Sequence, residues 1–243
     1  MRGISNPVLN HKVFAQHTGG QAMTITGTIN KTFFFLILVT ISAFYVWQLY
    51  AAGENIQPYM VIGLLGALIL GLVASFKPAT VPFTGPLYAL LKGMLIGGLS
   101  ARLEHEFGGI VIQAAAGTIA VFFAMLILYR LRLIKATKRF RSVVLTATAG
   151  IFLLYLIHII LRFFDLGVPV IRDATPLGII FSLFVIVIAA LNLIIDFDFI
   201  EKGVQRRSSK KMEWYGAFGL TVTLIWLYIE ILRLLAKIRR MKN

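Results

Sequence analysis

The sequence predicts an all-α integral membrane protein, built as a bundle of seven transmembrane helices. Hydrophobic residues make up 58% of its 243 residues and charged residues only 14%, whereas a soluble domain carries about 25% charged residues. Seven apolar runs approach the roughly 20 residues that a helix needs to cross the hydrocarbon core. Most of the positive charge lies between these runs, a pattern typical of loops that flank membrane helices.

Each apolar run is predicted to be a helix, because backbone groups in lipid must be hydrogen-bonded within their own segment. The runs cover residues 33–51, 59–76, 84–101, 109–129, 143–163, 176–197 and 215–236. The third run is the weakest, since it is short, rich in glycine and interrupted by Lys92. Residues 1–32 lack the continuous apolar core of a signal peptide, so no cleavage is expected. The chain is therefore divided into a polar N-terminal segment (1–32), a seven-helix transmembrane domain (33–236) and a basic C-terminal tail (237–243).

Small residues four positions apart predict where helices approach closely. Gly93 and Gly97 form one such step, and Ala116 and Ala120 form another. Small side chains at this spacing let two helix backbones pack against each other in a membrane.

The net charge of +14 predicts an orientation rather than a nucleic-acid partner. The basic residues lie between apolar runs and not on one amphipathic face, so no nucleic-acid binding is expected. They concentrate before the first run and in the loops 130–142 and 198–214, which places these segments on the cytoplasmic side. With seven spans the basic tail falls on the opposite side, against this rule. The loop 130–142 is also suited to holding anionic lipid.

The residues give little support for catalysis. The absence of cysteine excludes disulfides, thiolate chemistry and Cys-ligated metals. The sequence contains neither H-E-x-x-H nor G-x-S-x-G. The triplet from Asp196 to Asp198 resembles a metal-binding D-x-D motif, but two carboxylates alone are a weak signal. We therefore expect no enzyme activity, no cofactor and no resident metal.

Ionisable groups at membrane depth are costly, which makes each of them a functional candidate. Asp196 lies near the end of the sixth run, with Asn192 one turn earlier on the same face and Asp198 two residues later. The long side chain of Lys92 can reach towards these aspartates, so the four residues are predicted to form a cluster. The alternative is that both aspartates are solvated residues at a helix end.

Glu230 lies deep within the last run, with Thr223 on the same helix face. Either Arg233, three residues later, or Arg162 is available for a structural salt bridge, which is the alternative to a gating role. Gln113 is predicted to join two helices, and His158 to be a packing residue.

Four segments together resemble the Bax inhibitor superfamily, in its bacterial YccA-like branch. They are Ser5–Leu9, Met23–Thr32, Ala189–Gly203 and Met212–Phe218. The resemblance implies a seven-helix bundle with a central last helix, a cytoplasmic N-terminus and a cation leak, notably for Ca²⁺. It further implies gating by protonation of two acids, one near the end of the sixth helix and one in the seventh.

The first of these acids matches Asp196. The second falls at Glu230 in one alignment and near Thr223 in another, while Lys92 stands where related sequences often have an acid. We therefore expect a proton-sensitive leak for Ca²⁺ or other cations in a prokaryotic inner membrane. The alternative is a non-transporting interaction protein that modulates a membrane-bound quality-control protease. A secondary transporter is less favoured, because the sequence has no convincing internal repeat.

Overall fold

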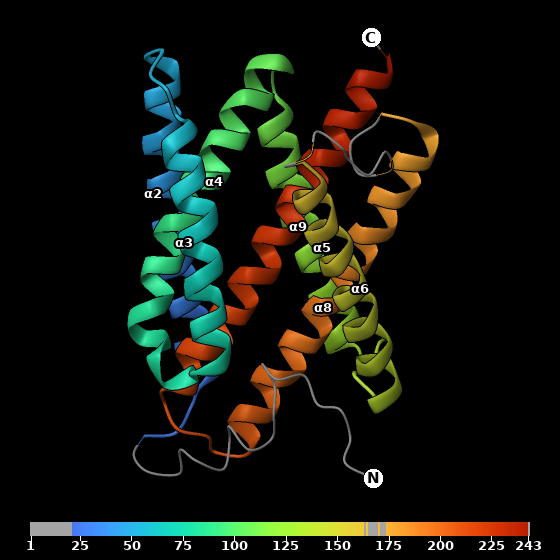
Figure 1. The fold of residues 1–243 in the computed structure, drawn as a ribbon. Helices are drawn as coiled ribbons and strands as arrows, with labels where there is room; N and C mark the ends of the chain where they lie inside the picture. Colours follow the sequence, from blue (N-terminus) through green and yellow to red (C-terminus); the bar gives the residue numbers. More distant parts are fainter. Residues whose placement is uncertain (1–20, 163, 165–169, 171–173, 243) are drawn as a thin grey trace. The chain divides into compact units, whose positions relative to one another are not determined.

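The computed structural model describes residues 21–162, 164, 170 and 174–242. Seven of its helices are long and apolar enough to cross a membrane, which confirms the predicted fold class. They are α2 (Ile25–Ala51), α3 (Gln57–Phe76), α4 (Val81–Glu106), α5 (Ile110–Arg130), α6 (Lys138–Arg162), α8 (Pro176–Gln205) and α9 (Met212–Lys242), with the short 3-10 helix η2 (Pro78–Thr80) before α4 (Figure 1). The weak third run is thus a complete helix, α4.

The first helix begins at Ile25, well before the apolar run that predicted it. The hydroxyl of Thr24 caps the helix by accepting a hydrogen bond from the Gly27 N–H at 2.9 Å. The hydroxyls of Thr28 and Thr32 then donate to carbonyl oxygens one turn back. Because these polar side chains are satisfied within the helix, the helix extends through a segment that hydropathy alone assigns to a polar tail.

The sixth and seventh spans are also longer than their apolar runs. α8 continues to Gln205, where Lys202 pairs with Asp198 and Gln205 donates to Glu201, each one turn apart. Such pairs at i and i+4 stabilise a polar helical extension. Hydropathy therefore predicted these spans but not the helical ends beyond them.

The chain divides into two compact units. Unit 1 consists of Met1–His105 with Asp196–Val222, and unit 2 consists of Glu106–Ile195 with Thr223–Asn243. Unit 1 therefore contains α2, α3 and α4 with the end of α8 and the start of α9. Unit 2 contains α5 and α6 with the remaining parts of α8 and α9.

In unit 1, α4 packs tightly against α2 through its glycines. A Cβ added to Gly93 would lie 2.4 Å from the carbonyl oxygen of Val39, and one added to Gly97 would lie 2.3 Å from that of Ala43. Both distances are far below van der Waals contact, so only glycine fits. The predicted glycine step is confirmed as a helix contact, and Figure 1 shows the helices of this unit side by side.

In unit 2, the core joins α6, α8 and α9. Ile151, Val185 and Ile188 form its centre, with Trp226 packed against them. The predicted step of Ala116 and Ala120 is not a packing contact within this unit, since both residues lie on the exposed side of α5. The buried small residues of α5 are Ala114 and Thr118 instead, so that prediction chose the wrong face of the helix.

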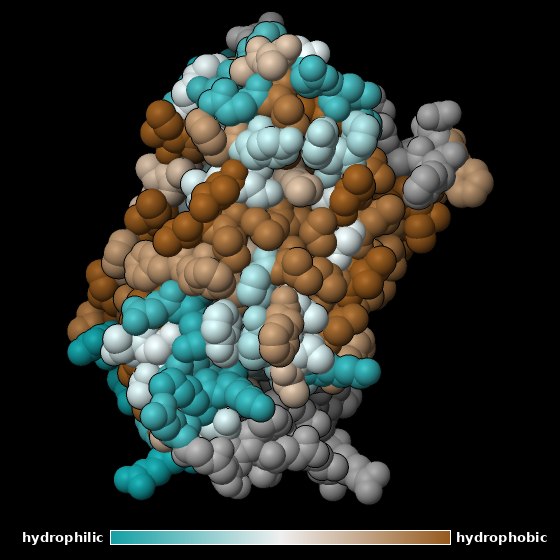
Figure 2. Space-filling view, turned by 90° about the vertical axis from the view of Figure 1, so that its left-hand side faces the viewer, coloured by the Kyte–Doolittle hydropathy of each residue, from teal (hydrophilic) through white to brown (hydrophobic). Residues whose placement is uncertain are grey.

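Many large apolar side chains remain exposed on these helices, among them Phe33, Phe44 and Phe83. On the face that Figure 2 shows, apolar side chains form a broad band between two zones of hydrophilic ones. Exposed apolar surface of this extent marks a surface that is covered by something other than water. Together with the seven spans, the band indicates contact with lipid hydrocarbon.

Candidate functional site

Asp196 places a carboxylate inside unit 1, where α8 faces α9. It lies nine residues before the end of α8, which corresponds to about 14 Å along the helix axis. Its Oδ2 is buried, and a Cβ added to Gly219 of α9 would lie 3.8 Å from its Oδ1. The carboxylate also interacts electrostatically with the hydroxyl of Tyr215. A carboxylate in this position can bind a proton or attract a cation within the helical bundle.

Asp198 is a buried residue, so it is not the solvated helix-end residue of the alternative interpretation. The Lys202 ammonium lies 2.9 Å from its Oδ2, one turn further along α8. This end of α8 therefore carries Asp196 and Asp198 in addition to Glu201, and Lys202 balances the charge of Asp198.

The two other residues of the predicted cluster fall in different units. Lys92 is half-buried on α4 in unit 1, the unit that also contains Asp196. Asn192 belongs to unit 2, where its amide donates to the Thr148 hydroxyl and to the Ile188 carbonyl oxygen, both at 2.8 Å. Asn192 thus links α8 to α6, which is a structural role that the sequence did not predict.

Glu230 is the centre of a polar cluster in unit 2, although only 1% of its surface is exposed. The Tyr155 hydroxyl lies 3.0 Å from each of its carboxylate oxygens, and Nη1 of Arg233 donates to the same oxygens at 3.0 and 3.2 Å. The Arg233 guanidinium also donates to the Tyr155 hydroxyl and lies over the Tyr155 ring. The salt bridge with Arg233, predicted as the structural alternative, is confirmed. The negative charge of Glu230 is therefore compensated where it lies.

The remaining candidates do not extend these groups. Thr223 is buried on α9 in unit 2, Gln113 is exposed near the start of α5 and His158 is half-buried on α6. The side chain of Arg162 lies outside the described residues. Within the part of the chain that the structure describes, no group of three or more His, Asp or Glu side chains could hold a metal ion.

A further buried and hydrogen-bonded carboxylate, that of Glu213, was not among the predicted sites. It is fully buried at the start of α9. Its Oε1 accepts hydrogen bonds from the N–H and the hydroxyl of Thr24, and its Oε2 pairs with the Lys31 ammonium, which also lies over the Trp214 ring. Glu213 and Lys31 are 182 residues apart, and no spacing rule connects residues so distant in sequence.

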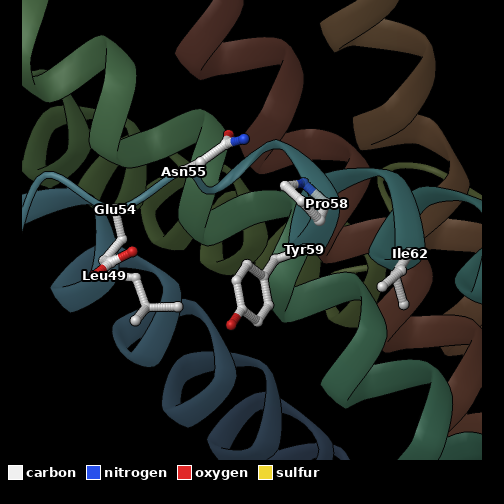
Figure 3. Close-up of a pocket in the computed structure, with 6 residues that line it drawn as sticks. All are labelled: Leu49, Glu54, Asn55, Pro58, Tyr59 and Ile62. Carbon is white, nitrogen blue, oxygen red and sulfur yellow. The ribbon is translucent and has the colours of Figure 1, made fainter.

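A cavity of about 680 Å³ lies at the junction of α2 and α3 in unit 1. Figure 3 shows its lining: Leu49 from α2, Glu54 and Asn55 from the loop, and Pro58, Tyr59 and Ile62 from α3. The cavity contains one carboxylate, that of Glu54, and none of the candidate residues.

Together, the seven spans and the buried charged groups define a multi-pass membrane protein with carboxylates inside its helical units. The model of the family described as Bax inhibitor 1 like matches residues 6–240, so the chain belongs to this family. A comparison with curated proteins gives no match. The match confirms the resemblance to the Bax inhibitor superfamily and agrees with the helical, membrane-spanning fold, whereas the YccA-like branch stays a prediction.

Proposed function

We propose that this protein is a proton-sensitive cation leak of the YccA-like type, and that Asp196 is its titrating group. The observation that carries the proposal is the Asp196 carboxylate, which has a buried oxygen and lies beside α9 well inside α8. An ionised carboxylate in an apolar setting is costly unless a proton, a cation or water compensates it. The proposed function involves no catalysis.

Protonation of Asp196 would control how α8 and α9 pack in unit 1. The neutral acid is compatible with the packed arrangement beside Gly219. The ionised form favours an arrangement in which water or a cation reaches the carboxylate. Cation flux should therefore rise as the pH rises through the titration of Asp196.

The other acids support this role in different ways. Asp198 lies two residues away, and Lys202 partly compensates its negative charge. Asp198 therefore adds some negative potential at Asp196, but less than an isolated carboxylate would. Glu230 is held by Arg233 and Tyr155, which favours a structural role for it over a gating one.

We further propose a prokaryotic inner membrane as the location, with the N-terminus and the loops 130–142 and 198–214 in the cytoplasm. This orientation rests on the excess of basic residues in these segments. Accessibility of single cysteines introduced at Lys135 and at Glu54 would test it, because the native chain has no cysteine.

The decisive experiment reconstitutes the full chain in liposomes and follows Ca²⁺ and K⁺ entry between pH 5 and pH 8. The wild type should show a flux that changes with pH, and Asp196→Asn should abolish the change. Glu201→Gln is the matched control, because it makes the same change from acid to amide on the same helix, at a residue whose carboxylate accepts a hydrogen bond from the exposed Gln205. An unchanged pH response in Asp196→Asn would contradict the proposal.

The alternative is a non-transporting protein that modulates a membrane-bound protease. The observation that favours it is the backbone pairing between residues 21–23 and the α8–α9 loop, where Met23 donates to Ser208 and Lys210 to Gln21. This pairing fixes residues 21–23, which directly follow the residues that the deletion below removes, against the α8–α9 loop. No flux at any pH, together with protease binding that survives Asp196→Asn and is lost on deletion of residues 2–20, would favour this alternative.

A further inference from the structure

The loop between α5 and α6 concentrates positive charge on an exposed surface. Arg130, Lys135, Lys138 and Arg139 are all exposed there. They lie at the end of α5, in the connecting turn and in the first turn of α6. We call these four residues the basic patch.

The backbone that carries the basic patch is ordered by hydrogen bonds. The N–H groups of Leu131 and Leu133 donate to carbonyl oxygens in the last turns of α5. Arg132 adopts a left-handed conformation with φ of 58°, which ends the helix. The Thr137 hydroxyl then caps α6 by accepting from the Phe140 N–H. The four cations are therefore presented together by two capped helix ends.

Unit 2 offers the basic patch little compensating charge. Residues 107–164 contain no acidic residue, and the two acidic side chains described in this unit, Glu106 and Glu230, already pair with Arg240 and Arg233. The first turn of α6 also lacks an acid, although the helix dipole there favours negative charge over positive. An anion outside the unit that pairs with these four cations would therefore be favourable.

Two exposed leucines indicate what kind of anion this is. Leu131 and Leu133 lie between the basic residues and are 64% and 70% exposed. A nucleic acid or a free phosphate would leave these apolar side chains in water. A phospholipid would satisfy both features, because its phosphate pairs with Lys and Arg while its interfacial region takes up the leucines. The two helices that flank the loop are membrane spans, so headgroups lie beside it.

We propose that the basic patch, with Leu131 and Leu133, is a docking surface for the headgroups of anionic phospholipids. The phosphates contact Arg130, Lys135, Lys138 and Arg139, and the leucines enter the membrane interface. The proposal does not depend on the cation leak or on which leaflet the loop faces.

Native mass spectrometry of the full chain in detergent tests the proposal, with phosphatidylglycerol and phosphatidylcholine as probes. In the variant Arg130→Gln/Lys135→Gln/Lys138→Gln/Arg139→Gln, we expect phosphatidylglycerol to bind about tenfold more weakly or worse, since each basic residue near a membrane surface adds to the attraction of anionic lipid. Binding of phosphatidylcholine should stay unchanged. The matched control is Arg206→Gln/Arg207→Gln/Lys210→Gln/Lys211→Gln, which removes the same charge from the α8–α9 loop, where no leucine lies between the basic residues, and should weaken binding less than the patch variant does.

Three results would overturn the proposal. Equal losses in both variants would mean that net charge alone attracts the lipid. Unchanged phosphatidylglycerol binding in the patch variant would exclude the surface. Binding of a short RNA that is lost in the patch variant, without any change in lipid binding, would assign the patch to nucleic acid. If the patch variant fails to fold, Leu131→Ser/Leu133→Ser tests the same surface, with an expected loss of about threefold or more for phosphatidylglycerol and a contradiction if the loss is absent.

Discussion

The two buried glutamates of α9 show how differently a membrane protein can use the same side chain. Glu213 lies in unit 1 and Glu230 in unit 2, and both are almost completely inaccessible. The cation that pairs with Glu213 is Lys31 of α2, which is distant in sequence, whereas Arg233 follows Glu230 by three residues on the same helix. The first ion pair joins two helices, and the second is local.

The two glutamates also differ in their uncharged hydrogen-bond partners. Glu213 also accepts from the backbone N–H of Thr24, so it holds the beginning of α2 and, through the pairing of Met23 with Ser208, the segment before it. Among the described residues, Glu230 contacts a second helix through the Tyr155 hydroxyl. Removing Glu213 should therefore disturb tertiary structure more than removing Glu230 does.

The largest effect is expected for Glu213→Ala. It leaves the Lys31 ammonium, with 18% of its side chain exposed, without its carboxylate. Breaking a buried ion pair by removing one partner costs about 3 kcal/mol or more. Thermal unfolding in detergent should show a marked drop in the midpoint, and Glu213→Ala/Lys31→Met should recover part of it. A drop no larger than that of Glu230→Ala would contradict the distinction between the two sites.

A smaller but more specific effect is expected for Gly27→Ala. A Cβ at this position would lie 2.3 Å from the Glu213 carboxyl carbon, so the substitution should cost about 1–3 kcal/mol through overpacking. Gly150→Ala on α6 is the matched control, because its Cβ would meet nothing within 4 Å.

The two substitutions at this site should not be additive. In the Glu213→Ala background, Gly27→Ala should be nearly neutral because the clashing carboxylate is gone. An equal loss of unfolding free energy in both backgrounds would show that the clash lies elsewhere.

The contrast between these sites also separates what the sequence could predict from what it could not. The salt bridge of Glu230 with Arg233 could be predicted from the sequence, because helix geometry brings residues i and i+3 together. The glycine step of α4 could be predicted in the same way, because residues four positions apart lie on one face of a helix. The pairing of Glu213 with Lys31 depends on how α2 and α9 pack, and hydropathy carries no information about which polar groups will meet.

The helix ends illustrate a second limit. Hydropathy located all seven spans, but it ended α8 at 197 and began the first span at 33. The structure extends both helices with polar residues whose hydrogen bonds are satisfied locally, such as Thr28 and Lys202. Asp196 consequently lies well inside α8 rather than at its solvated end. The distance of Asp196 from the end of α8 could not be derived from the apolar run that predicted this helix.

An intermediate effect is expected for Tyr155→Phe in unit 2. The change removes the hydroxyl that lies between Glu230 and Arg233 but keeps the aromatic ring beneath the guanidinium. Loss of a hydrogen bond to a charged group costs about 1–2 kcal/mol, which thermal unfolding can detect. Tyr50→Phe, whose ring packs against His105, is the control and should be nearly neutral. A loss as large as that of Glu213→Ala would contradict this ranking, because it would make the Tyr155 hydroxyl as important to stability as the whole ion pair of Glu213.

The smallest effect is expected for Glu106→Gln, which removes the second salt bridge described in unit 2. Its carboxylate accepts two hydrogen bonds from the Arg240 guanidinium, but both side chains are nearly half exposed. Water and salt weaken such a pair, so the loss should be about 0–1 kcal/mol and should vanish in high salt. The guanidinium also keeps its contact with the Phe107 ring. Unfolding measured at low and high NaCl beside Glu230→Gln tests this ranking. If Glu106→Gln lowered the unfolding free energy as much as Glu230→Gln, burial would not be what distinguishes the ion pairs of this protein. The ranking of all three glutamates would then have to rest on the geometry of their contacts.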